Sequence, residues 1–261
     1  ASLYPCFAGI NGSVRIAAIR VSFLEDDSPG TTGNGSFLLN APIDTCGRYT
    51  IDPVPHDRSY FESQLVAVNN YFRSVSYGKF GLDLDQSIVF PLSDENSYVL
   101  PKTMDYYHPY NQTDIHDQRV TELFRDALET AYNDDEIDFS NFDHVVIFHA
   151  GIGQDFSLPF LDPTPEDIPS TFIDDDMLQE FVGGMLQFGT VTINQGIILP
   201  ETQNHLFYQE SENIFLDAEE PCDYQYGLTG TFALMLGFAI GLPPLWDTNS
   251  GQSGIGIFGL M

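Results

Sequence analysis

The stretch Gly227–Asp247 reads G-L-T-G-T-F-A-L-M-L-G-F-A-I-G-L-P-P-L-W-D. It matches the residues that flank the ligands in a zinc-binding helix, but the ligands themselves are replaced. A catalytic zinc helix carries H-E-x-x-H, in which two histidines four residues apart hold the metal and the glutamate activates water. Here A-I-G-L-P followed by L-W-D-T matches the tail of the longer pattern H-E-F-G-H-A-L-G-L-P-D-L-Y-D-T. The histidine positions are then Leu234 and Phe238, the glutamate position is Met235, and the downstream acidic ligand is Pro244. None of these side chains can bind zinc or transfer a proton.

Further segments continue the match outside this stretch. They are V-R-I-A-A-I-R-V-S-F (14–23), T-T-G-N-G-S-F (31–37), Y-F-E-S-Q-L…Y-F-R-S-V-S-Y-G-K-F (60–80), V-V-I-F-H-A-G-I-G-Q-D (145–155) and S-G-I-G-I-F-G-L-M (253–261). Together they resemble the secreted zinc metallopeptidases of the immune-inhibitor-A type, and Met261 falls where those enzymes have a methionine turn beneath the metal. The resemblance implies a zincin-like α/β (α+β) fold, with a twisted mixed sheet, long helices and a central apolar helix. It also implies a zinc peptidase, but the sequence departs from the family at every zinc position and at the base.

The histidines and the acidic clusters are the other candidates for metal ligands. The six histidines include His144 and His149, which are five residues apart on an expected strand and so face opposite sides. We therefore expect no histidine-based catalytic zinc. Oxygen ligands suit calcium, which related secreted peptidases use for stability, although a solvated acidic loop is the alternative for each cluster. The calcium candidates are Asp26, Asp27, Asp162, Glu166, Asp167, Asp174, Asp175 and Asp176.

The three cysteines are Cys6, Cys46 and Cys222, and none belongs to a C-x-x-C motif. In a secreted protein, three cysteines predict one disulfide and one remaining thiol. We expect Cys46 to bond with Cys222, or either of them to bond with Cys6. The low lysine content and the family resemblance likewise favour a secreted or cell-surface protein.

The charge is extreme and uneven. The chain has 38 Asp and Glu against 9 Lys and Arg, and residues 126–261 contain 23 acidic residues and no lysine or arginine. Nucleic-acid binding is excluded, because phosphates require a cationic surface. The acidic half favours divalent cations, a protein partner with a basic surface, or self-assembly with such a neighbour. A surface that only confers solubility is the alternative.

The hydrophobic pattern predicts one continuous α/β unit over residues 1–261. No apolar run reaches the ~18 residues of a membrane span. Because related enzymes continue beyond the methionine turn, we expect the chain to be the N-terminal part of a longer polypeptide. The expected strands are 14–23, 81–90, 144–149 and 190–199, and the expected helices are 59–74 (capped by Ser59), 113–132 and 227–240.

These observations predict a catalytically inactive, metallopeptidase-like extracellular domain with a structural or binding role in a surface or extracellular assembly. Leu234, Met235 and Phe238 would fill the vacated metal site by packing, and the helix that carries them would be buried on nearly all sides. One alternative is that the three side chains line an apolar pocket and the domain binds a glycan or peptide in the former cleft. Another is an enzyme whose site lies elsewhere.

Overall fold

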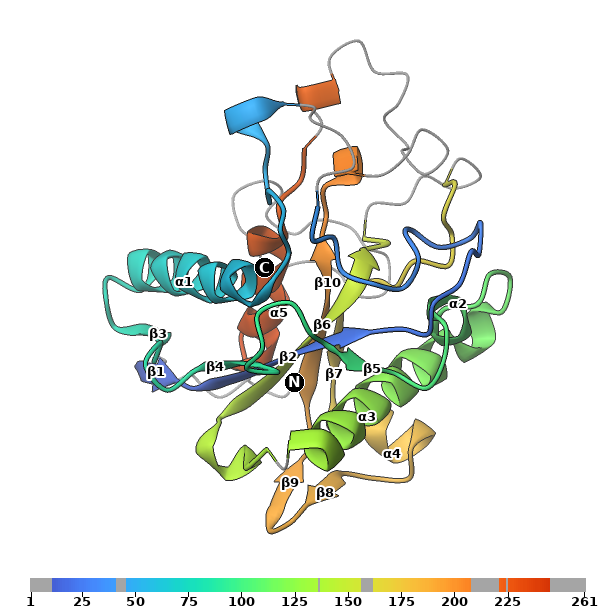
Figure 1. The fold of residues 1–261 in the computed structure, drawn as a ribbon. Coiled ribbons are helices and arrows are strands. Elements are labelled where there is room, and N and C mark those ends of the chain that lie inside the picture. The colour runs from blue at the N-terminus through green and yellow to red at the C-terminus, as the bar shows by residue number, and fades with distance from the viewer. Residues whose placement is uncertain are drawn as a thin grey trace, which may run out of the picture.

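A computed structural model of the chain describes residues 11–40, 46–135, 137–155, 162–207, 221–223 and 225–244. The strands of its main sheet are β2 (Ile16–Ser22), β4 (Ile88–Phe90), β5 (Tyr98–Val99), β6 (His144–Ile152), β7 (Thr171–Ile173) and β10 (Gly196–Thr202). They form a six-stranded sheet in the order β4-β2-β6-β10-β7, with β5 also paired to β2 (Figure 1). All pairs are parallel except β10 with β7, which is an antiparallel edge strand. The expected mixed α/β architecture is therefore confirmed.

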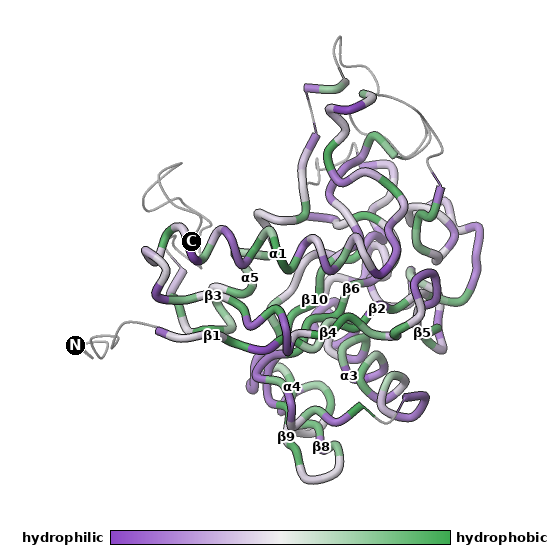
Figure 2. The backbone as a smooth tube through the Cα atoms, turned by 60° about the vertical axis from the view of Figure 1, so that its left-hand side comes forward, coloured by the Kyte–Doolittle hydropathy of each residue, from purple (hydrophilic) through white to green (hydrophobic). Residues whose placement is uncertain are grey.

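The central strands are apolar on both sides, so the sheet must be covered on both faces. On β2, Ala17 and Ile19 face one apolar cluster while Ile16 and Ala18 face the other, because alternate residues of a strand point to opposite sides. Strands β6 and β10 divide their side chains between the same two clusters. Figure 2 shows these hydrophobic strands lying together at the centre of the molecule.

Helices supply the two covers. The face that carries Ile16 and Ala18, called the first face below, packs against α1 (Arg58–Val75) and α5 (Leu228–Ala239). The opposite face packs against α2 (Met104–Tyr107), α3 (His116–Asp135) and α4 (Asp175–Phe181). The apolar residues of α1 and α3 recur every three or four positions and are buried, as in amphipathic helices that cover a sheet. None of the helices in these described ranges has both the length and the hydropathy to cross a membrane.

The start of α1 differs from the expectation. The cap is Asp57, whose carboxylate accepts a hydrogen bond from the backbone N–H of Tyr60 at 3.1 Å, and Ser59 lies inside the first turn. Asp and Ser are both strong N-caps, so the residue types alone do not distinguish them. The carboxylate also accepts a hydrogen bond from the Ser59 hydroxyl at 2.7 Å, which keeps that side chain at the helix start.

Two expected strands are interrupted. The segment 81–90 divides between β3 (Phe80–Leu82), which pairs with β1 (Gly12–Val14), and β4. The break is a turn at Asp83, whose carbonyl accepts hydrogen bonds from the N–H and the hydroxyl of Ser87. The segment 190–199 divides between β10 and the hairpin of β8 (Leu186–Phe188) and β9 (Val191–Ile193). In both places a local turn overrides strand propensity.

Strand β6 continues beyond the expected end at His149. It runs through Gly151, which has φ +90° and lies against Met104. A Cβ at Gly151 would be 2.8 Å from the terminal carbon of Met104. Glycine therefore permits both the backbone conformation and the close approach that let the strand reach Ile152.

Candidate functional site

Helix α5 carries Leu234, Met235 and Phe238, three of the four positions that the sequence resemblance aligns with a zinc-peptidase motif. It follows Gly227 and buries Leu228, Phe232 and Leu236 in the cluster that covers the first face of the sheet. Phe232 meets Phe148 of β6 edge-on, with ring centroids 5.5 Å apart. The helix is apolar in every turn, so its attachment to the sheet is set by shape and not by charge.

The three aligned positions lie on the outer side of this helix, and the fourth, Pro244, follows it. Leu234, Met235 and Phe238 are half-buried, and Pro244 is exposed. Phe238 contacts Phe172 of the edge strand β7, with ring centroids 6.3 Å apart, and Met235 packs against the same cluster as the buried face of the helix. The expectation that the helix is buried on nearly all sides holds in part: within α5 only Gly230 is exposed, but the side that carries Leu234, Met235 and Phe238 is half-buried. A helix that covers one face of a sheet leaves its outer stripe partly open.

A fully buried carboxylate lies next to the start of α5. Glu201 of β10 is completely inaccessible, and its Oε1 accepts a hydrogen bond from Gly151 N at 2.7 Å. Its Oε2 accepts from Leu38 N at 2.9 Å and pairs with His56 Nδ1 at 2.7 Å. The Nε2 of His56 lies 2.9 Å from the carbonyl of Asp52. With an acceptor at each ring nitrogen, the imidazole is best satisfied as the doubly protonated cation.

The electrostatics of His56 agree with this assignment. Burial lowers its pKa, but the hydrogen bond and the charge of Glu201 outweigh burial and raise the pKa above the ordinary value. The result is an ion pair inside the protein in which both partners keep hydrogen bonds. Such a pair costs desolvation energy to form, and losing one partner leaves an uncompensated buried charge.

Asp52 joins this network to the helix. One carboxylate oxygen accepts from the Gln64 side chain at 3.0 Å, and the other accepts from the Thr202 hydroxyl at 3.1 Å and from Leu228 N at 2.8 Å. Leu228 is the first residue of α5, so a negative charge meets the positive end of the helix dipole. A cavity of about 400 Å³ adjoins the network and is lined by Asp52, Pro53, Pro55, Ser59, Tyr60, Ser63, Gln64, Ala67 and Thr229.

More titratable groups are buried around the carboxyl ends of β6 and β10. Burial raises the pKa of Asp167 to about 8, although Thr32 donates to its carboxyl group from both its N–H and its hydroxyl. Burial lowers the pKa values of His108, His149 and His205 to about 4. These histidines are therefore neutral in the folded protein at pH 7, and Asp167 is largely protonated.

These shifts predict a stability maximum near pH 6.5. Between pH 6.5 and 4 the unfolded chain binds protons at the three histidines that the folded protein does not, so stability falls as the pH falls. Asp167 acts in the opposite sense from pH 3.8 to about pH 8, because over this range the folded protein keeps a proton that the unfolded chain has lost. His56 also lowers stability as the pH rises above 6.5, because its pKa is raised in the folded protein. Urea denaturation from pH 4 to 9 measures both arms.

The Asp167→Asn variant separates the two arms of this profile. It should flatten the loss of stability above pH 6.5 and steepen the acidic arm, because the histidines are untouched while the opposing contribution of Asp167 is removed. A wild-type profile that rises steadily to pH 9 would contradict the assignment of a protonated Asp167.

The calcium candidates divide between two places. Tertiary structure brings the loop that carries Asp26 and Asp27 next to the loop that carries Asp162, Glu166 and Asp167, through a hydrogen bond from Glu166 N to Gly30 O at 2.8 Å. Asp174 caps α4 by accepting from Met177 N at 2.9 Å, and Asp175 and Asp176 are exposed in the first turn of that helix. Within the described ranges, no three His, Cys, Asp or Glu side chains are grouped so that they could hold a metal ion.

The expected disulfide between Cys46 and Cys222 is confirmed. Cys46 and Cys222 are bonded, with an S–S distance of 2.01 Å, while Cys6 and Met261 lie outside the described residues. Gln225 reinforces the same junction, since its side chain accepts from Ile51 N at 2.8 Å and donates to Tyr49 O at 3.2 Å. A stable disulfide of this kind is typical of oxidising compartments outside the cytosol.

The network of Asp52, His56 and Glu201 was not found by sequence reasoning. These residues belong to no motif, and Glu201 lies 145 positions from His56. The only local signal is a charged residue within the apolar strand β10. Comparison with known proteins adds no assignment, because no protein-family model matches the chain and a search of curated proteins finds no match.

Proposed function

We propose that this protein is a catalytically inactive, metallopeptidase-like extracellular domain with a structural or binding role in a surface or extracellular assembly. The observation that carries the proposal is the chemistry of α5. Its former ligand positions hold Leu234, Met235 and Phe238, and Phe238 packs against Phe172 of the neighbouring edge strand. Side chains that contact each other in this way stabilise the fold through burial and offer no lone pair to a metal.

The arrangement of the elements supports a zincin-like origin. The sequence resemblance implies a twisted mixed sheet, long helices and a central apolar helix. The protein has a mixed sheet with an antiparallel edge strand, the long helices α1 and α3, and the apolar α5 against β7 and β10. The Cys46–Cys222 disulfide supports an extracellular location, and the acidic composition supports a binding role towards cations or basic surfaces.

The proposal predicts that the purified protein neither retains zinc nor cleaves peptides. After dialysis against buffer containing zinc, elemental analysis should find far less than one zinc per chain, because apolar side chains occupy the ligand positions. Casein and unstructured peptides should remain intact with and without added zinc. One tightly held zinc per chain, or hydrolysis that a chelator abolishes, would refute the proposal.

Restoring two of the motif residues tests the same idea from the opposite direction. The double variant Met235→Glu, Phe238→His should lose about 2–3 kcal/mol of unfolding free energy, because half-buried apolar contacts are replaced by polar groups. It should gain no peptidase activity, since Leu234 and Pro244 still supply no ligands. The matched control, Phe238→Leu, should lose only about 1 kcal/mol. A double variant as stable as wild type would contradict the packing role.

A further inference from the structure

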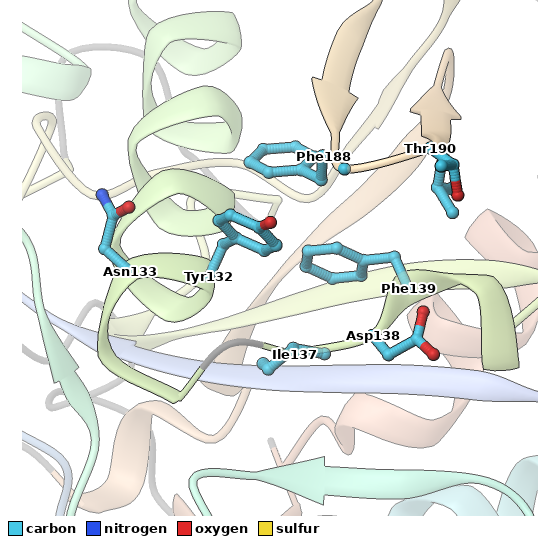
Figure 3. A pocket seen from close by; sticks show the side chains of 9 residues that line it. Tyr132, Asn133, Ile137, Asp138, Phe139, Phe188 and Thr190 are labelled. Carbon is cyan, nitrogen blue, oxygen red and sulfur yellow. The ribbon is translucent and has the colours of Figure 1, made fainter.

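A cavity of about 550 Å³ opens on the other side of the sheet from α5 (Figure 3). It lies between the last turn of α3, the short 3-10 helix Phe139–Asn141 and the β8–β9 hairpin. Its walls belong to the apolar cluster that α5 does not join. The lining residues are Tyr132, Asn133, Ile137, Asp138, Phe139, Phe188, Gly189, Thr190 and Val191.

Three aromatic rings form a fixed wall of this cavity. The ring centroid of Phe188 lies 5.3 Å from that of Tyr132 and 5.2 Å from that of Phe139. The two phenylalanines are buried, whereas Tyr132 is half-buried. In Figure 3 the hydroxyl of Tyr132 points toward the space that Phe188, Phe139 and Thr190 surround. Gly189, in the hairpin turn with φ +59°, places no side chain over that hydroxyl.

Two features place negative charge at or near the cavity. Helix α3 ends beside it in Asp134 and Asp135 with no basic residue in the last turn, so the negative end of the helix dipole is not offset. These two carboxylates do not line the cavity, and that of Asp135 accepts a hydrogen bond from the Tyr98 hydroxyl. Asp138 is exposed, and hydrogen bonds from Ser140 hold its pKa below the usual value, so it is ionised at neutral pH. None of the nine lining residues is Lys or Arg.

We propose that this cavity binds an organic cation, namely the guanidinium or ammonium end of an arginine or lysine side chain. The face of the Tyr132 ring attracts a cation, and its hydroxyl oxygen can accept a hydrogen bond from it. The carboxylate of Asp138 supplies the opposite charge at the rim. An anionic ligand would be repelled by the same groups, and a neutral sugar would gain nothing from the helix end.

The inference is independent of the proposed loss of zinc chemistry, because the cavity and α5 lie on opposite faces of the sheet. It adds the chemistry of the partner. A protein that docks here would insert a basic side chain. The source of the cation, a protein side chain or a free amino acid, is decided by the experiment.

Isothermal titration of the intact protein with N-acetyl-arginine amide and N-acetyl-citrulline amide tests the inference. The two probes have nearly the same shape, but citrulline carries no charge. The arginine probe should bind with a roughly millimolar dissociation constant and the citrulline probe about tenfold more weakly, and added salt should weaken only the former. Equal binding of both probes, or binding of neutral methyl glycosides in place of arginine, would overturn the proposal.

Variants locate the site. Asp138→Asn should weaken arginine binding about fivefold while its amide oxygen still accepts from Ser140, and Tyr132→Phe should weaken it to a smaller extent. The control Asp27→Asn removes one exposed charge far along the chain and should change nothing. Equal effects of Asp138→Asn and Asp27→Asn would show diffuse attraction only and would refute the site. If free L-arginine binds at least tenfold more tightly than the blocked probe, the natural ligand of the cavity is a free amino acid. If the two bind equally, the natural ligand is a protein side chain.

Discussion

The Glu201→Ala variant should lose about 3–5 kcal/mol of unfolding free energy, because it leaves the buried His56 cation without its partner. It also leaves the N–H groups of Leu38 and Gly151 without their acceptor. Urea denaturation at pH 6 measures the loss. At this pH the contribution of the pair is fully present, since it is lost only as the pH rises through the raised pKa of His56.

A surface ion pair provides the matched control for this variant. Arg58 and Glu62 are paired at 2.8 Å on α1, where the Glu62 side chain is 46 % exposed. Glu62→Ala should therefore cost only about 0.5 kcal/mol, because solvent screens the pair. The double variant His56→Phe, Glu201→Leu should recover part of the loss by removing both charges together. A loss below about 1 kcal/mol for Glu201→Ala would show that His56 is not a buried cation that depends on Glu201.

Removing the disulfide should have an effect of similar size. The double variant Cys46→Ser, Cys222→Ser frees a loop with a sequence separation of 176, and loop-closure entropy predicts a loss of about 5 kcal/mol. Wild-type protein in excess reductant should show the same loss, whereas reductant should not affect the double variant. The bond and Gln225 hold the same two segments, so Gln225→Ala should cost more without the disulfide than with it. A double variant within 1 kcal/mol of wild type would contradict this role.

Periodicity identified most of the scaffold. The β-branched alternation of β2, the apolar stripes of α1 and α3, and the uninterrupted apolar run of α5 are local signals, and each element is present. The turns that divide 81–90 and 190–199 were missed. Strand propensity is summed over a window of residues, whereas the turn at Asp83 and the hairpin at Gly189 are formed by hydrogen bonds between a few particular residues. The side of α5 that faces the sheet was also missed. A helix that is apolar all round carries no signal for which stripe is inside.

The sequence by itself determined that Leu234, Met235, Phe238 and Pro244 stand where the resemblance places metal ligands and a base, and that the acidic half of the chain lacks any lysine or arginine. These are statements about residue types, which need no coordinates. Only the tertiary structure decided that Asp52, His56 and Glu201 share one buried network, that Cys46 meets Cys222, and that Tyr132 and Phe188 wall one cavity. The physical reason is that long-range contacts depend on how the parallel strands and their crossover helices are arranged. The separation of two residues along the chain does not determine the distance between them in the folded protein.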